Sequence, residues 1–325
     1  MVVARWIMLS ALALAAVQPA IAQTSPAAGS GPADIVVIAQ RSGVPVWKVI
    51  GPRSTLVLVG SIGRVSPGTQ WDPTALDAAL TRADQIIFPD AWNISLGLFS
   101  AIGLLGKWRA QASLPKGQTL QAITTPAQWA RLVALRHRGL LKKGFERSHP
   151  YHLAVSLNGM VRDKRKMAPG VDTYVRRFLS KNRDKEVPVV KDSLKQVTAA
   201  FFASDPREHV ACLMSMVAMV EAGETGVRMR AAARDKRSQA WAQRHVPAAV
   251  AARTEDGWQS CWPKGSRIEQ AREARLSPLM QDLLRRPDAT LAVVPLDSLA
   301  KPGGVLDKLS AAGFDVQGPT WKPDA

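Results

Sequence analysis

The stretch that decides the fold is Thr55–Pro89, TLVLVGSIGRVSPGTQWDPTALDAALTRADQIIFP. It opens with an apolar, β-branched strand pattern that stops at Gly60 and closes with a short apolar strand over Gln85–Pro89. Between them, Asp72 before Pro73 fits a helix N-cap followed by the first helical residue. Apolar residues then recur at the spacing of one helix face, at Leu76, Ala79, Leu80 and Ala83. A strand, a helix and a strand in this order predict a mixed or parallel sheet covered by helices.

Segments at both ends of the chain extend this sheet. Val44–Ile50 and Thr55–Gly60 flank a four-residue turn, which predicts a hairpin. A buried strand, a helix and a closing strand are predicted near the C-terminus, over Thr290–Leu296, Leu299–Gly313 and Phe314–Val316. The sequence therefore predicts an α/β fold, with a mixed sheet built from N- and C-terminal segments and a largely helical insert over about 125–285.

Helical patterns fill the middle of the chain. The stretch Thr125–Gly139 has Pro126 at its first turn and Gly139 as a stop. Asp205–Glu208 is interpreted as a capping box with proline at the first helical position, opening a strongly apolar helix. Further helices are predicted over 170–182, 192–204 and 223–250.

The N-terminus has the pattern of a secretory signal peptide. Arg5 precedes an apolar run over Trp6–Val17, and the small residues near Ala22 form a cleavage site. Residues 1–22 are therefore predicted to be a signal peptide, residues 23–40 a flexible linker and residues 41–325 a single domain. Cleavage near Ala22 would place the mature chain in the periplasm or outside the cell, and no later run is long enough to span a membrane. An uncleaved membrane anchor is the alternative.

The two cysteines, Cys212 and Cys261, suit an exported protein. In an oxidising compartment an even pair predicts a disulfide bond, worth about 4 kcal/mol in the chain-entropy model. Two buried thiols are the alternative. Alkylation of both thiols without prior reduction, read by mass spectrometry, would exclude the bridge.

Positive charge is concentrated in one part of the chain. The formal net charge is +17, and the segment 131–191 holds 16 Lys or Arg against 5 Asp or Glu. A basic exported protein can meet an anionic envelope polymer or lipid surface. Nucleic acid is disfavoured because the segment lacks interleaved aromatic residues for base stacking. A solvated basic face that aids solubility is the other interpretation.

Polar side chains at the strand ends are the candidate ligand-binding residues. The carboxyl ends of strands are where α/β proteins hold ligands, which selects Ser61, Arg64, Asp90, Asp297 and Ser298. Ser61 directly follows Gly60, one residue too early for a Gly-x-Ser-x-Gly nucleophile elbow. No histidine and acid can be assigned to it, so no catalytic residue is predicted.

The histidines do not predict a metal site. His149 and His152 lie three residues apart, but Pro150 between them argues against a regular helix, and no Asp or Glu occurs within the next ten residues. Neither a metal nor another cofactor is predicted.

Several blocks together resemble the TraB/GumN family, over Val44–Pro319. The N-terminal blocks are Trp47-Lys48, Gly60-Ser61-Ile62-Gly63, Pro67-Gly68 and the helix DPTALDAALTRAD followed by QIIFPD. The later blocks are DKRSQAWA, Asp235–Ala242, and LAVVPLDSLAKPGGVLDKLSAAGFDV, Leu291–Val316. The resemblance implies a fold like that of the erythromycin-esterase and haem-binding ChaN-type proteins.

The same resemblance implies that the family's metal chemistry is lost here. Some members are metal-dependent peptidases, with two Gly-x-x-His motifs and a glutamate as the proposed machinery. In this chain Gly63 and Ser298 stand at the two histidine positions, and only Asp90 remains near the acidic one. Glycine and serine cannot replace two imidazoles as ligands of a divalent metal.

We therefore expect a divergent family member, a pseudoenzyme that acts as a non-catalytic binding or accessory module of the cell envelope. The alternative is a divergent, peptidase-like hydrolase whose site at the strand ends is rebuilt or free of metal.

Overall fold

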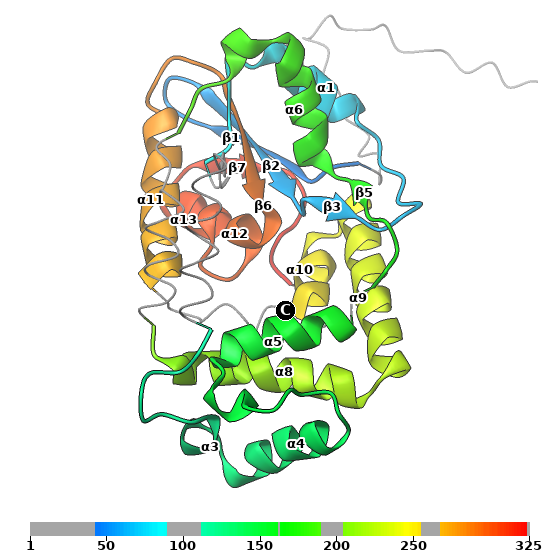
Figure 1. Cartoon of the computed structure of the whole chain (residues 1–325). Helices are drawn as coiled ribbons and strands as arrows, with labels where there is room; N and C mark the ends of the chain where they lie inside the picture. Colours follow the sequence, from blue (N-terminus) through cyan, green and yellow to red (C-terminus); the bar gives the residue numbers. More distant parts are fainter. Residues whose placement is uncertain (1–42, 90–111, 162, 190–203, 255–266, 324–325) are drawn as a thin grey trace, which may run out of the picture. The chain divides into compact units, whose positions relative to one another are not determined.

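A five-stranded mixed sheet lies in the upper part of the view in Figure 1, flanked by helices. The computed structural model describes residues 43–89, 112–161, 163–189, 204–254 and 267–323, and residues 40–325 group as one compact unit. The strand order is β4-β6-β2-β1-β7. The strands are β1 (Val46–Ile50), β2 (Thr55–Ser61), β4 (Gln85–Ile87), β6 (Thr290–Pro295) and β7 (Asp315–Gln317).

The pairing of the strands confirms the predicted α/β class and the use of both chain ends. β1 and β2 form the expected antiparallel hairpin, with Val46 opposite Val59. β6 lies between β2 and β4 and runs parallel to both, with Val59 opposite Val293. The carboxyl ends of β2 and β6 therefore meet at one edge of the sheet.

Helices cover the sheet and share one apolar core with it. Trp47, Leu58, Val294 and Trp241 are completely buried in this core. The indole Nε1 of Trp241 donates a 2.7 Å hydrogen bond to the carbonyl oxygen of Gly60. The helices in contact with this core are α1 (Thr74–Arg82), α6 (Val171–Lys181), α9 (Glu224–Ala242), α10 (Val246–Thr254), α11 (Arg267–Leu283), α12 (Leu296–Ala300) and α13 (Val305–Ala311).

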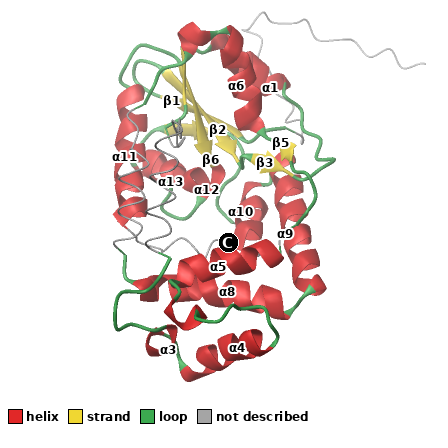
Figure 2. Cartoon of the chain, in the orientation of Figure 1, coloured by secondary structure: helices red, strands yellow, loops and turns green. Residues whose placement is uncertain are grey.

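A second, wholly helical core is built by the middle of the chain (Figure 2). α4 begins at Pro126 as predicted, with a Thr125–Gln128 capping box, and buries Leu132 and Leu135. Trp129 and Val133 of the same helix are only partly buried. The helices of this core are α3 (Leu120–Ile123), α4 (Pro126–His137), α5 (Pro150–Met160) and α8 (Val210–Glu221).

Two helix predictions near the sheet are wrong in detail. The helix expected over 299–313 is two helices, α12 and α13, because Pro302 and the left-handed Gly303 (φ +69°) interrupt the helical backbone. The helix expected to start after Asp72 begins at Thr74, with Pro73 at the N-cap. Asp72 still accepts a 2.9 Å hydrogen bond from the Thr74 backbone N–H.

Two predictions in the helical middle are also wrong. Pro150 does not disrupt a helix; it is the first residue of α5, where a missing N–H costs nothing. Asp205 does not form a capping box. It accepts a hydrogen bond from the Arg207 N–H and opens a 3₁₀ turn, η3 (Pro206–His209), which leads into α8.

Some predictions fall on residues outside the described ranges: the signal peptide and linker, Asp90, residues 192–203 of the helix predicted over 192–204, and Cys261. Cys212 is completely buried in α8, and its bond to Cys261 stays a prediction. Within the described ranges, no single helix is both long and apolar enough to cross a membrane. The consecutive segments Pro206–Glu221 and Glu224–Ala242 meet that test only together, across a bend of 115°.

Candidate functional site

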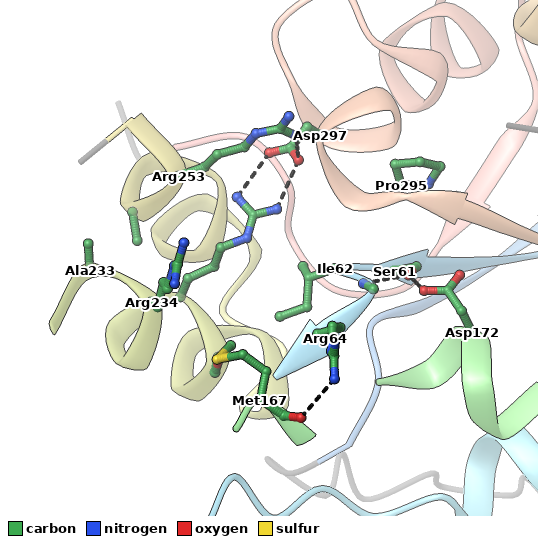
Figure 3. Close-up of a pocket in the computed structure, with 14 residues that line it drawn as sticks. Ser61, Ile62, Arg64, Met167, Asp172, Ala233, Arg234, Arg253, Pro295 and Asp297 are labelled. Carbon is green, nitrogen blue, oxygen red and sulfur yellow. Dashed lines mark hydrogen bonds and ion pairs between the residues drawn. The ribbon is translucent and has the colours of Figure 1, made fainter. Parts of the chain in front are cut away.

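A pocket of about 450 Å³ lies where β2 and β6 end (Figure 3). Ser61 and Pro295, the last residues of these parallel strands, both line it. Its other walls come from the turn after β2, the short strand β3 (Arg64–Val65), and the helices α6, α9, α10 and α12. Its lining residues are Ser61, Ile62, Gly63, Arg64, Met167, Asp172, Ala233, Arg234, Arg237, Ser238, Ala252, Arg253, Pro295 and Asp297.

One end of the pocket holds a serine and a carboxylate. The Ser61 hydroxyl donates a hydrogen bond to Oδ2 of Asp172, which lies in the first turn of α6. The Ser61 oxygen in turn accepts a 3.0 Å hydrogen bond from the Gly63 N–H. Ser61 therefore links the end of β2 to the start of α6, and its hydroxyl proton is already used in the hydrogen bond to Asp172.

A close backbone approach sets the position of Asp172. Gly170, just before α6, donates a 3.2 Å hydrogen bond to the Gly63 carbonyl oxygen. A β-carbon on Gly170 would lie 2.7 Å from that oxygen and 3.0 Å from the Gly63 carbonyl carbon. Only glycine lets α6 start this near the turn after β2.

We expect Gly170→Ala to lower the free energy of unfolding by about 1–3 kcal/mol, because the new methyl group meets backbone that cannot move aside cheaply. Urea unfolding measures this change. Gly159→Ala is the matched control: Gly159 is an exposed residue of α5, and a β-carbon there meets nothing within 4 Å. That control should be neutral or stabilising by up to about 1 kcal/mol. Equal stability of the two variants would contradict the close-approach argument.

The opposite end of the pocket holds two arginines on one aspartate. Arg237 of α9 binds Asp297 through both terminal nitrogens, at 2.8 and 3.3 Å, and Arg253 of α10 contacts the same carboxylate. The Asp297 side chain is 11% exposed and that of Arg237 15%. Burial alone would raise the pKa of Asp297, but the two guanidinium groups outweigh it and hold the pKa below its ordinary value.

Two contacts from α9, one to β2 and one to the residue after β3, fix the position of its arginines. The Trp241 indole binds the Gly60 carbonyl, as described above, and Oγ of Ser238 accepts a 2.9 Å hydrogen bond from the Ser66 backbone N–H. Arg234 lies four residues before Ser238, and Arg237 lies four residues before Trp241, so each arginine is the neighbour of one of these contacts on the helix surface. The sheet edge thereby sets where both guanidinium groups lie.

The charge of the pocket is positive. Four arginines line it, Arg64, Arg234, Arg237 and Arg253, against the two aspartates Asp172 and Asp297. Within the described residues, the one hydrogen bond found for the Arg64 guanidinium is to the Met167 carbonyl, at 3.2 Å, and no carboxylate lies within ion-pair distance of it.

The structure brings together three of the five predicted ligand-binding residues: Ser61, Arg64 and Asp297. Ser298 is buried in α12 and does not line the pocket. It comes one residue after Asp297 in the helix, and successive helical side chains point in different directions. Asp90 lies outside the described residues.

Sequence reasoning missed the residues that the helices supply, Asp172, Arg234, Arg237 and Arg253. A usable signal exists for two of them. Arg234 and Arg237 lie at helical spacing with Ser238 and Trp241, a polar residue that binds the turn after β3 and an aromatic residue that binds β2. For Asp172 and Arg253 the local sequence carries no such signal.

The lining residues do not suit the metal that the family resemblance implies. Gly63 stands in the pocket wall at the first histidine position and offers no ligand atom. The two aspartates that line the pocket are engaged, Asp172 by Ser61 and Asp297 by two arginines. Across the described part of the chain, no group of three or more His, Cys, Asp or Glu side chains is arranged to hold a metal ion.

Three of the five histidines gather elsewhere, next to the helical core. His149 caps α5, its Nδ1 accepting a 3.2 Å hydrogen bond from the Tyr151 N–H. Its ring lies 5.1 Å from that of His209 and 6.2 Å from that of His152, centroid to centroid. His149 and His209 are 5% and 0% exposed. Burial lowers the pKa of each to about 4, and for His149 the neighbouring imidazoles add to this effect.

The mixed sheet and the strand-end pocket define an α/β protein with a ligand-type pocket at the carboxyl edge of its parallel strands. A family model, TraB/PrgY/gumN family, matches residues 45–318. The chain belongs to this family, as a divergent member without the Gly-x-x-His motifs. No curated protein and no solved structure matched the chain.

Proposed function

We propose that the chain is a non-catalytic binding module of the cell envelope whose strand-end pocket holds a small anionic ligand. The observation that carries this proposal is the set of four arginines around the pocket, opposed by only two aspartates. Its volume of about 450 Å³ falls within the range of small-molecule sites. Guanidinium groups pair well with carboxylate and phosphate oxygens, because their N–H donors match that geometry.

Export belongs to the same proposal. Cleavage near Ala22 would deliver the mature chain to the periplasm or the outside, where the Cys212–Cys261 bond would form.

We further propose that the basic segment 131–191 meets an anionic envelope polymer or lipid surface; exposed lysines such as Lys142 and Lys143 would contribute. Binding to anionic vesicles should then weaken steeply with added salt, and salt-insensitive binding would contradict this role. The proposed fold relatives are the erythromycin-esterase and ChaN-type proteins.

The binding proposal is tested by titrating the mature chain with inorganic phosphate in a calorimeter. We expect measurable binding that weakens by about tenfold when Arg64 and Arg234 are both replaced by alanine, because the pocket then loses two of its four positive charges while Arg237 and Arg253 keep their contacts with Asp297. Arg53→Ala is the control, because Arg53 is exposed in the β1–β2 turn and does not line the pocket. Equal binding by the double variant and the control would refute the assignment of the pocket.

A divergent hydrolase is the second candidate, and the Ser61–Asp172 hydrogen bond is what favours it. A serine nucleophile needs a base, and a histidine usually provides it, whereas no histidine is among the lining residues. A generic peptidase and esterase screen separates the candidates. Turnover that Ser61→Ala abolishes would establish the hydrolase; no turnover is expected for the binding module.

A further inference from the structure

The two ends of the pocket have opposite hydrogen-bonding character (Figure 3). Asp297 and Arg253 lie on one side, and the Ser61–Asp172 pair lies on the other, with Ile62 drawn between them. At the arginine end the groups available to a ligand are donors. At the Ser61–Asp172 end they are acceptors.

At the arginine end, Asp297 positions the guanidinium groups without using all their donors. Its carboxylate carries one negative charge and faces two positive ones, so the trio keeps a net positive charge. Each guanidinium has five N–H donors. Asp297 takes two from Arg237 and one from Arg253. The remaining donors suit an oxyanion.

At the other end, the Ser61 hydroxyl donates its single hydrogen bond to Asp172, and the Ser61 oxygen already accepts a hydrogen bond from the Gly63 N–H. An ionised carboxylate only accepts hydrogen bonds, and its two oxygens offer about four lone pairs. Asp172 therefore has acceptor capacity left for a ligand. A second oxyanion placed there would be repelled, so this end requires a donor.

We infer that the pocket recognises a small hydroxylated oxyanion, with its carboxylate or phosphate group at Arg237 and Arg253 and a hydroxyl group donating to Asp172. This inference rests on the proposed function and names its ligand class. A hydroxyl is favoured over an ammonium group because the lining has two more arginines than aspartates. A net anion gains more from that excess charge than a zwitterion does.

The test compares three probes on the mature chain: glucose 6-phosphate, which has both groups, inorganic phosphate, which has only the oxyanion, and glucose, which has only hydroxyls. We expect glucose 6-phosphate to bind at least about tenfold more tightly than phosphate, because a hydrogen bond to a charged group is worth about 1.5–3 kcal/mol. Glucose should bind more weakly than both. Glucuronate against acetate repeats the comparison with a carboxylate and shows which oxyanion the pocket prefers.

The variant Asp172→Asn locates the acceptor. It keeps the shape of the side chain and a carbonyl oxygen for Ser61, but presents N–H donors to the ligand. The advantage of glucose 6-phosphate over phosphate should disappear, with phosphate affinity unchanged or improved. Asp77→Asn is the matched control: Asp77 accepts a 2.7 Å hydrogen bond from the Tyr174 hydroxyl of α6 but does not line the pocket.

The outcomes distinguish the proposed anion-binding function from the inferred ligand class, a hydroxylated oxyanion. Equal affinity for glucose 6-phosphate and phosphate in the unaltered chain, or an advantage that survives Asp172→Asn, overturns the inference and leaves the anion-binding function standing. No binding of any charged probe overturns both. Should Asp172→Asn fail to fold, the probe series on the unaltered chain still decides, because it needs no substitution.

Discussion

Acidification from pH 7 to about pH 4.5 should destabilise the folded chain by several kcal/mol, because His149 and His209 are buried as neutral imidazoles. Burial is the main cause of the low pKa, about 4, of both side chains in the folded state. An unfolded chain would take up these protons near the ordinary histidine pKa of about 6.5.

The direction of the effect follows from these values. Below about pH 6.5 the unfolded state takes up protons that the folded state does not bind. The free energy of unfolding therefore decreases as the pH is lowered, until the folded imidazoles also titrate near pH 4. The loss approaches about 3 kcal/mol for each imidazole at the acid end, as an upper figure. The interval from pH 6.5 to 4.5 isolates the histidines, because most carboxylates titrate below it.

Urea unfolding at pH 7 and pH 4.5 measures this loss. His209→Gln should remove its share of the pH dependence, whatever it does to stability at pH 7. His137→Gln is the matched control, since His137 is exposed at the end of α4. A stability that stays constant between these pH values would show that the imidazoles are not buried as described.

Asp297→Ala should lower the free energy of unfolding by about 3 kcal/mol, because it leaves Arg237 with no matching charge in a site where that side chain is only 15% exposed. Removing one partner of a buried ion pair costs about 3–5 kcal/mol. The lower figure applies here because the Arg253 side chain is 42% exposed and is partly solvated on its own.

Urea unfolding of Asp297→Ala and of Asp282→Ala makes the comparison. Asp282, in the last turn of α11, pairs with Arg286 just after the helix, and both side chains are about half exposed, so its loss should cost at most about 0.5 kcal/mol. Phosphate titration of Asp297→Ala adds a second readout, because guanidinium groups that are no longer held in place should bind anions differently. If both variants unfold alike, the Asp297 trio does not stabilise the fold.

Local sequence patterns sufficed for the elements whose interactions are close in the chain. The β1–β2 hairpin follows from two apolar runs around a short turn, and α4 from Pro126 at its first turn and the stop at Gly139. Ser61, Arg64 and Asp297 could be selected in advance as candidate ligand-binding residues, since the carboxyl ends of strands are where α/β proteins hold ligands. These inferences need only the regular spacing of apolar and polar residues along a strand or helix and the residues that start or stop it.

The tertiary structure decided the interactions between distant parts of the chain. Pairing of β6 between β2 and β4 joins segments more than 200 residues apart, and only that packing brings Asp297 opposite Ser61. Likewise, the Trp241 contact with Gly60 sets where α9 crosses the sheet edge and thus where its arginines lie. A helical pattern specifies which residues share a face of the helix, but not which segment packs against that face. The packing partner depends on how the whole core is assembled.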